Sequence, residues 1–454
     1  METIIKKKKP KESMQQNQLK SIVKLNTQYT PPYDSPWFET ENKVSLDAYI
    51  KHLFSLSKQY LKSNVHPDTI KGVFVPHDGI RYSGLCAASS YNQLIGRTRP
   101  ITRIILLCTN HDISNSFIST SYNDIMSYNS NNSSSSSSSS SSNKSLLKLD
   151  TTIINYLKPY IKIDNNRFDN EHSFFNQLPF IEYIISQING KNSKDSKTIN
   201  EKNVLLLPFL ISNNINLLYE HTRNNIRHIL HKIIELLKNR DTILICTSDL
   251  SHINGHFKTK INSNIYQNIR KKDNEILQFL YNGVNGLNER NQKLDDILFI
   301  ANSPSCGTLA IYFFAKILHN YSGSLDYSSS SSSNSSGSKS PTYINVTNTM
   351  NWLNKKDIKD IKDIKETNIV NNFKQLAPCV CCYYTSLMRN KINIYDFNPL
   401  DLNIVLDITD KTESSISYAG IIFTIQPYIE LNKIRQNETF FSDYEKIALR
   451  GLIN

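Results

Sequence analysis

Short continuous apolar runs alternate along this chain with longer segments whose apolar residues recur every three or four positions. The runs occupy 72–75, 104–108, 204–207 and 243–246. Because they are continuous and do not alternate with polar residues, they predict strands covered on both faces. Periodic segments predict helices over 45–62, 84–95, 172–186, 217–238, 262–281 and 308–318, and two further strands are predicted at 343–347 and 418–425. Strands that alternate with helices predict a single α/β domain with a mainly parallel sheet flanked by helices.

Polar, low-complexity stretches interrupt this pattern and bound it. We expect a basic arm over 1–33, one α/β domain over 34–426 and a C-terminal extension over 427–454. Within the domain, three inserts stand at about 127–145, 324–340 and 352–412; two are Ser-rich, and the third begins with a repeated Lys-Asp-Ile unit. Such compositions do not bury enough apolar surface to order a chain, so we expect disordered loops that stay outside the core.

Composition and charge narrow the class of protein. The 454 residues carry a net charge of +12, and the run Lys6–Lys9 contributes to it. Such a run can bind nucleic acid or an anionic membrane, but a solvated arm is the simpler interpretation, and no specific nucleic-acid partner is expected. No apolar run is long enough to span a membrane, and no apolar segment of a secretory signal follows the lysines. Seven scattered cysteines indicate free thiols in a reducing compartment, the cytoplasm or nucleus.

Residues of types that bind metals or act in catalysis follow several of the predicted strands. His77 and Asp78 come after the first strand, His111 after the second, and Asp249 with His252 after the fourth; Cys306 precedes the last helix. Residues just past the carboxyl ends of parallel strands meet in one crevice. Imidazole and thiolate suit iron, copper or zinc. Each residue alone could be structural, as a hydrogen-bonded His, a buried Cys or a helix cap, but together they indicate a metal or catalytic site.

Several motifs, in order, resemble the signature of the Memo family, the mediators of receptor-driven cell motility and their bacterial and archaeal relatives. The matching segments are 75–88, 34–38, 170–173 with 178–180, 248–252, 306–307 and 414–420. The resemblance implies a fold similar to that of class III extradiol dioxygenases, which hold Fe(II) with two His and a carboxylate. The Memo site is similar, with Cys in place of the carboxylate.

Carried over motif by motif, the resemblance implies His77, His111 and Cys306 as metal ligands. It places Asp249 and His252 in the same pocket, with His252 where the dioxygenases keep an acid/base His. It implies iron, first as Fe(II), or copper, and the donor types are also compatible with zinc. Animal members bind phosphotyrosine peptides of receptors near this pocket and affect the cytoskeleton, so peptides of that kind and cytoskeletal signalling proteins are the expected partners.

Further residues of these motifs are expected to line the pocket, namely Trp37, Tyr82, His172 and Asp78. Asp78 departs from the family pattern, which has Ala; it could be a surface-loop residue or an acceptor that orients the imidazole of His77. Glu171 and His172 could be catalytic or could start a helix. Asp112 and the segment 175–177 also depart from the pattern, which weakens the expectation of peptide recognition.

Three functions are compatible with these residues and motifs. The first is a metal-binding protein in redox chemistry or metal handling, with a role in cell signalling. The second is an oxidoreductase of the extradiol dioxygenase type, and the third a phosphopeptide-binding adaptor without catalysis. The absence of GxGxxG, Walker A and Gly-x-Ser-x-Gly motifs argues against dinucleotide binding of the Rossmann type, P-loop chemistry and elbow-type serine hydrolysis. Cys379, Cys381 and Cys382 could bind metal or be acylated, but ordinary loop or strand thiols are favoured, and His228 and His231 are expected on an amphipathic helix.

Overall fold

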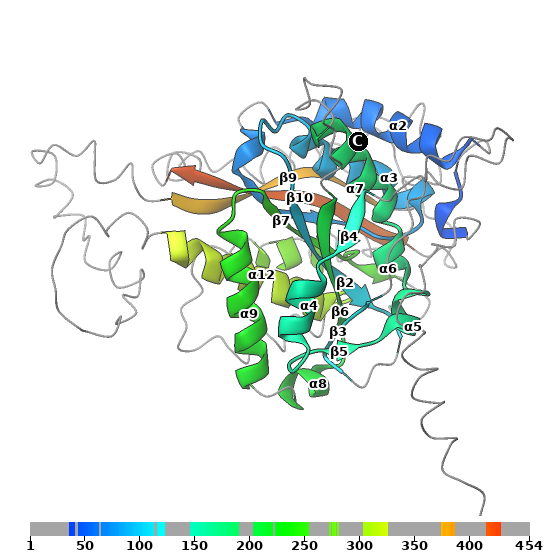
Figure 1. Cartoon of the computed structure of the whole chain (residues 1–454). Coiled ribbons are helices and arrows are strands. Elements are labelled where there is room, and N and C mark those ends of the chain that lie inside the picture. Colours follow the sequence, from blue (N-terminus) through cyan, green and yellow to red (C-terminus); the bar gives the residue numbers. More distant parts are fainter. Residues whose placement is uncertain are drawn as a thin grey trace, which may run out of the picture.

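A computed structural model shows one large sheet with helices on both of its faces (Figure 1). It describes residues 36–40, 44–62, 65–112, 116–122, 146–189, 203–220, 223–253, parts of 272–280, 303–325, 374–385 and 415–427. The arm at 1–33, the insert at 127–145 and the strand predicted at 343–347 lie outside these residues, as do most of the helix predicted at 262–281 and all but the first residue of the C-terminal extension.

The centre of the sheet is parallel. Its four strands, in spatial order, are β6 (Val204–Ser212), β2 (Arg103–Asn110), β7 (Thr242–Thr247) and β1 (Ile70–Val75). Thr247 lies opposite both Val75 of β1 and Cys108 of β2. The carboxyl ends of these three strands therefore reach the same edge of the sheet, and the loops that follow them start side by side.

Antiparallel strands extend the sheet beyond β1, and both parallel and antiparallel pairings extend it beyond β6. β10 (Ser415–Pro427) pairs with β1 and with β9 (Lys374–Thr385), and its first residues pair with β8 (His252–Ile253). Beyond β6 lie the short strands β3 (Ile118–Thr120), β4 (Leu147–Leu149) and β5 (Lys162–Ile163). The sheet is therefore mainly parallel, as the sequence pattern predicted, and its antiparallel pairings lie outside the four central strands.

Two groups of helices cover the sheet (Figure 1). α2 (Leu46–Leu56), α3 (Ile80–Tyr91) and α7 (Leu178–Asn189) pack together on one side, and α9 (Arg223–Leu237) and α12 (Thr308–Leu325) on the other. Shorter helices complete the described chain: α4 (Thr151–Leu157), α5 (Asn165–Phe168), α6 (His172–Phe175), α8 (Ile215–Glu220) and the 3-10 turns Pro36–Phe38, Ser57–Tyr60, Pro67–Thr69 and Asn92–Leu94. None of the described helices is long and apolar enough to cross a membrane.

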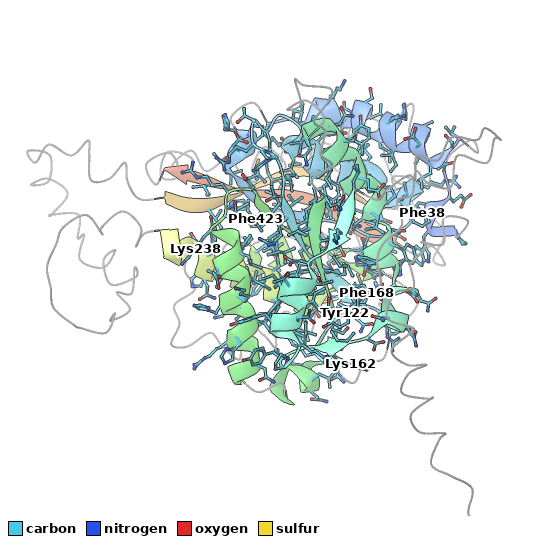
Figure 2. The ribbon with its side chains drawn as sticks, in the orientation of Figure 1. Phe38, Tyr122, Lys162, Phe168, Lys238 and Phe423 are labelled. Atoms are coloured by element: carbon cyan, nitrogen blue, oxygen red, sulfur yellow. The ribbon has the colours of Figure 1, made fainter. Side chains whose placement is uncertain are left out.

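The core lies between the sheet and these helices, where side chains fill the space (Figure 2). Every residue of β1 and β7 is buried, as the continuous apolar runs predicted. Phe314 of α12 packs against Phe423 of β10 and Phe74 of β1, with ring centroids 5.3 and 6.4 Å apart. Truncating an aromatic side chain in such a core typically costs about 3–5 kcal/mol.

The predicted strands within the described residues and most predicted helices are confirmed, but several boundaries differ. α3 begins at Ile80, before the predicted 84, and α12 continues to Leu325, beyond the predicted 318. The helix predicted over 172–186 is divided into α6 and α7, because Pro179 has no main-chain N–H and is tolerated only in the first turn of a helix, so a new helix begins there. Between the two helices, the side chains of Asn176 and Gln177 donate hydrogen bonds to the carbonyls of His77 and Pro76. The helix predicted over 217–238 corresponds to α8 and α9, and residues 221–222 between them lie outside the described residues. Ser45 caps α2, accepting a hydrogen bond from the main-chain N–H of Ala48.

The prediction that the insert 352–412 stays outside the core is wrong for 374–385. These residues form β9, which pairs with β10 along its whole length. Leu376, Cys381 and Tyr384 are fully buried there. This strand was not predicted, because it follows a charged low-complexity repeat whose composition indicates a disordered loop. The outer limits of the domain, 34 and 426, stay a prediction.

Candidate metal centre

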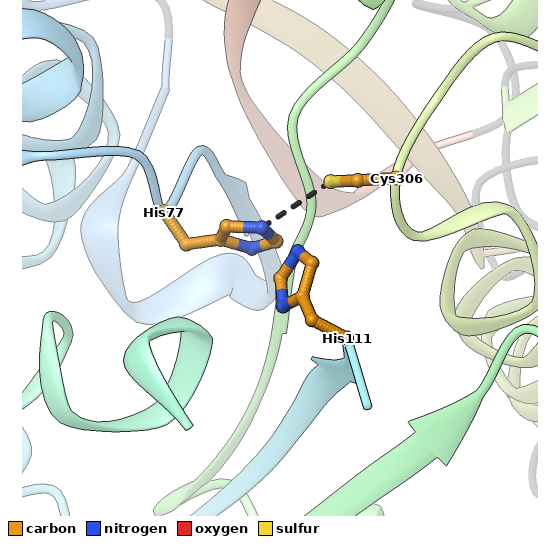
Figure 3. Close-up of side chains that lie close together, drawn as sticks. All are labelled: His77, His111 and Cys306. Carbon is orange, nitrogen blue, oxygen red and sulfur yellow. Dashed lines mark hydrogen bonds between the residues drawn. The ribbon is translucent and has the colours of Figure 1, made fainter. Parts of the chain in front are cut away.

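Three candidate ligands from distant parts of the chain converge at the carboxyl edge of the sheet (Figure 3). His77 follows β1, His111 follows β2, and Cys306 is separated from α12 by Gly307 alone. One donor atom from each lies within 4.8 Å of those of the other two. Nε2 of His77 is 3.2 Å from Sγ of Cys306, and the two imidazole rings are perpendicular, with centroids 4.9 Å apart.

His77 is held by β7 and the loop that follows it. Its ring atom Nδ1 lies 3.3 Å from the hydroxyl of Thr247, the last residue of β7. Its main-chain N–H donates to Oδ1 of Asp249 over 2.9 Å. Because Nδ1 is engaged on the strand side, Nε2 faces the thiol of Cys306. The side chain is completely buried, so this orientation is set by packing as well as by hydrogen bonds.

His111 is held by one carboxylate at two points. Oε1 of Glu171 lies 2.8 Å from Nδ1 of the ring, and Oε2 accepts the main-chain N–H of His111 over 2.9 Å. The same carboxylate accepts the N–H of Ser173 at the start of α6. Glu171, expected either to start a helix or to be catalytic, does cap α6, and it also binds the candidate ligand. With Nδ1 engaged, Nε2 of His111 is the nitrogen available to the centre.

Cys306 occupies a turn that only glycine can continue. A Cβ atom at Gly307 would collide with the hydroxyls of Thr109 and Ser248. Ser305 donates to the main-chain carbonyl of Asp249 over 2.6 Å, and Asn213 donates to that of Cys306. These contacts fix the thiol against the ends of β2 and β7.

Asp249 and His252 lie at the same centre, as the resemblance implied. Oδ2 of Asp249 is 3.7 Å from Nε2 of His77 and 4.0 Å from Nε2 of His252. Asp249, His252 and Cys306 form a second group whose donor atoms lie within 4.8 Å of one another. A carboxylate and a further imidazole therefore stand beside the first three ligands.

Burial drives three groups of the centre that bear on metal binding, His77, His252 and Cys306, toward their neutral forms. It lowers the pKa of His77 well below its usual value, and the neighbouring imidazoles of His111, His172 and His252 lower it further. It lowers the pKa of His172 to about 3 and that of His252 to about 4. Burial, with Asp249 nearby, raises the pKa of the Cys306 thiol. Neutral imidazole is the form that binds metals, and a bound metal deprotonates a ligating thiol.

The residues present fit a transition metal. Two imidazoles and one thiol are the donor set of iron, copper and zinc sites, whereas magnesium and calcium prefer oxygen. The 3.2 Å between nitrogen and sulfur is below the sum of typical metal–nitrogen and metal–sulfur bonds, about 4.3 Å, so one ion can bind both. The structure thus brings the three predicted ligands together; that they bind a metal stays a prediction.

Of the other residues predicted to line the pocket, Trp37 and His172 lie in a stack of rings beside the centre, and Tyr82 lies on α3. Trp37 stacks on His172 with ring centroids 3.9 Å apart, and His172 stacks on His111 at 4.3 Å. These three rings form a column that reaches the centre. Tyr82 lies in the first turn of α3, with its ring centroid 5.8 Å from the Arg81 guanidinium.

The interpretation of Asp78 as the group that orients the His77 imidazole is wrong. Its carboxylate accepts hydrogen bonds from the hydroxyl of Tyr418, over 2.5 Å, and from the N–H of Gly79, over 2.7 Å. Thr247 faces Nδ1 of His77 instead. Asp78 is largely buried and is not a surface-loop residue, and burial raises its pKa.

The remaining sequence candidates lie elsewhere. Cys379, Cys381 and Cys382 belong to β9, and the thiol of Cys86 on α3 contacts the carbonyl of Cys382 over 3.5 Å. His228 of α9 stacks on Tyr160. Within the part of the chain that the structure describes, each group of three close donor residues includes His111 or Cys306.

Comparison with known proteins agrees with this architecture. The sequence model of a family described as Memo-like protein matches residues 37–347. A relative described as a MEMO1 family protein, from Sulfurisphaera tokodaii, is 27% identical over 188 residues. That match covers 41% of this chain and 54% of the relative, so the chain spans about half the length of that relative.

Proposed function

This chain belongs to the Memo-like protein family, and we propose that it binds one redox-active metal ion through His77, His111 and Cys306. The observation that carries the proposal is the convergence of one nitrogen or sulfur donor from each residue within 4.8 Å. These residues come from three segments that are not adjacent in sequence. Each is also held by partners that leave its ligating atom directed toward the others.

The donor set favours iron or copper. Two imidazoles and one anionic ligand resemble the ligand set of non-haem Fe(II) oxygenases, which leaves open positions on the metal. Thiolate in place of carboxylate shifts the preference toward softer ions such as Cu(I). Asp249, 3.7 Å from Nε2 of His77, adds an oxygen donor that suits iron. We propose Fe(II) as the physiological ion, with copper as the alternative and zinc as a competitor.

A bound iron or copper ion would supply one-electron redox chemistry to this pocket. His77 and His111 would hold ring nitrogens toward the ion, and Asp249 fixes the loop of His77 by accepting its main-chain N–H. His252, neutral at pH 7 because its pKa is lowered to about 4, can accept a proton at the edge of the centre. On this basis we propose a role in redox chemistry or metal handling, in the cytoplasm or nucleus, connected with cell signalling as the family resemblance implies.

Elemental analysis of the whole chain, purified and reconstituted under low oxygen, tests the proposal. Wild type is expected to hold close to one equivalent of iron or copper, and the variants Cys306→Ser and His111→Ala close to none. Cys379→Ser is the matched control, because it removes a thiol from β9 without touching the centre, and it should retain the metal. Absence of metal from reconstituted wild type would overturn the proposal.

A second candidate is an oxygen-dependent oxidoreductase of the extradiol dioxygenase type. It is favoured by the neutral imidazole of His252 beside Asp249, 4.0 Å away, since such a group can act as a general base. Oxygen uptake by the iron-loaded protein with a panel of catechols tests it. Uptake that is lost in His252→Ala, with iron retained, would support catalysis, and no uptake with any catechol would exclude this substrate class.

A third candidate is an adaptor for phosphotyrosine peptides. The column of Trp37, His172 and His111 favours it, because stacked rings offer an aromatic platform beside the centre. Peptide binding measured with wild type and His77→Ala, each with and without metal, tests it. Binding that survives both changes would show that the metal is not the recognition element.

A further inference from the structure

One short segment contacts the loops after β1 and β2 and the end of β7 at once. It runs from Glu171 to Gln177 and includes the helix α6; we name it the ligand brace. Its first half binds β2 and β7. Ser173 donates from its hydroxyl to the carbonyl of Thr109 over 2.6 Å, and its own carbonyl accepts the hydroxyl of Thr247 over 3.1 Å. Glu171 binds His111 at the ring and at the main chain.

The second half of the brace binds the loop of His77. The side-chain amide of Asn176 donates to the carbonyl of His77 over 2.9 Å and to that of Asp78 over 3.2 Å. The amide of Gln177 donates to the carbonyl of Pro76 over 3.1 Å. Both side chains are 1% exposed. Three consecutive carbonyls of the loop that carries His77 are therefore capped by two buried amides.

We propose that the ligand brace positions the two imidazoles for metal binding, with Asn176 acting on His77 and Glu171 on His111. This inference rests on the proposed metal site. The loops after parallel strands have few main-chain partners of their own, since their backbone leaves the sheet ladder. Hydrogen bonds from a buried segment supply these partners and fix where each ring lies. Glu171 in addition fixes Nδ1 of His111, so that Nε2 is the nitrogen presented to the ion.

Segment 175–177 is also where this sequence departs from the family pattern. From the sequence alone, Asn176 and Gln177 stand where the family pattern has other pocket residues. In the structure both are supports of the loop that carries a candidate ligand, and they lie 99 and 101 positions from their acceptors. The departure is therefore compatible with a working centre, because it changes how the loop is held and leaves His77 in place.

Cobalt(II) titration of the whole chain tests the brace, because cobalt reports ligand geometry through its visible bands. We expect Asn176→Leu and Glu171→Gln to bind close to one equivalent at saturation, with the affinity lowered about 10- to 100-fold and the bands shifted. Asn92→Leu is the matched control. Asn92 is a buried amide that also donates two hydrogen bonds, to Phe54 and Ser57, at a site that contains none of the candidate ligands. It should lower the melting temperature and leave cobalt affinity and spectrum unchanged.

The outcomes separate the brace from the metal site. Wild-type affinity and spectrum in both brace variants, with loss of binding in Cys306→Ser, would overturn the brace and leave the metal site standing. No cobalt binding by wild type would overturn the metal site and the brace together. If Asn176→Leu does not fold, Asn176→Ala is used, which also removes both donated hydrogen bonds but adds no apolar branch; unchanged affinity in that variant would overturn the role of Asn176.

Discussion

Buried polar side chains stand at both ends of the parallel strands, but their partners differ between the two ends. At the amino ends, buried basic side chains are bound by main-chain oxygens of their own chain. Arg97 and Lys71 donate to the carbonyls of Pro67, Ile70, Arg240, Asn239 and Thr242. Arg99 nearby pairs with Asp241 over 2.8 Å. This end is held together by contacts that the chain itself supplies.

At the carboxyl ends the buried polar groups are potential metal ligands, mostly imidazoles, and they face one another. His77, His111 and His252 gather around the thiol of Cys306, and His172 stacks on His111. Burial, with the neighbouring imidazoles, lowers the pKa of His77. Protonated imidazoles this close together would repel one another, whereas neutral imidazoles can share a bound cation. Buried polarity alone therefore does not mark a functional site. What distinguishes the carboxyl end is several ligand atoms directed at one another.

The largest effect is expected at the amino end and should be confined to stability. Arg97→Met removes the donor to three main-chain carbonyls from a side chain that is completely buried. We expect a loss of about 3 kcal/mol in the free energy of unfolding, since each buried carbonyl left without a donor costs about 1–3 kcal/mol. Urea unfolding measures the loss. The half-exposed Arg99→Met should cost less than about 1 kcal/mol, and a fall in metal affinity with Arg97→Met would remove the contrast between the two ends.

Metal loading should stabilise the protein through the carboxyl end. At a free metal concentration of about 100 times the dissociation constant, binding to the folded state alone adds about 2.7 kcal/mol to the free energy of unfolding. Thermal unfolding with and without a chelator measures this shift. Cys306→Ser should show none of it, whereas Arg97→Met should show all of it. An equal shift in Cys306→Ser would mean that the metal binds elsewhere.

Gly307→Ala should affect stability and metal binding together. The added methyl collides with the hydroxyls of Thr109 and Ser248, and the turn that carries Cys306 must move. We expect a loss of about 1–3 kcal/mol and weaker metal binding, measured by urea unfolding and cobalt titration. Gly79→Ala is the matched control, because its Cβ would lie 3.5 Å from the nearest atom, in ordinary contact. Normal metal affinity in Gly307→Ala would contradict the rigid placement of Cys306.

The smallest effect is a pH dependence that belongs to the amino end. Burial lowers the pKa of Lys71 from 10.5 to about 7. Between these values the unfolded chain holds a proton that the folded protein has released, so the contribution of Lys71 to stability rises with pH and is lost as pH falls toward 7. The stability of wild type relative to Lys71→Met should therefore increase by about 1 kcal/mol between roughly pH 7.5 and 8.5. The exposed Lys51→Met should show no such change, and a difference that is flat with pH would show that Lys71 stays charged.

The sequence predicted the centre of the fold well, because strands buried on both faces must be apolar at every position. β1, β2, β6 and β7 were found in this way. β9 was missed, since it follows a low-complexity repeat, and the break between α6 and α7 was missed although Pro179 marks it in the sequence. The hydrogen bonds of Asn176 and Gln177 in that break end on residues 99 and 101 positions away. A local pattern carries no information on such partners.

For the candidate site, the order of elements was enough to show which residue types stand at which strand ends. His77 and His111 follow parallel strands, and parallel strands in register bring their carboxyl ends to one edge. The family motifs then implied Cys306 as the third ligand. These inferences need only the succession of strands and helices and the chemistry of the side chains.

What each side chain faces was settled only by the folded chain. Glu171 reaches His111 across 60 positions, and Tyr418 reaches Asp78 across 340, which removes Asp78 from the role that its place beside His77 suggested. Strand position limits a residue to one edge of the sheet. The hydrogen bonds of a side chain decide whether it can bind a metal, supports a ligand or makes a structural contact. The partners in those hydrogen bonds are brought near only by tertiary packing.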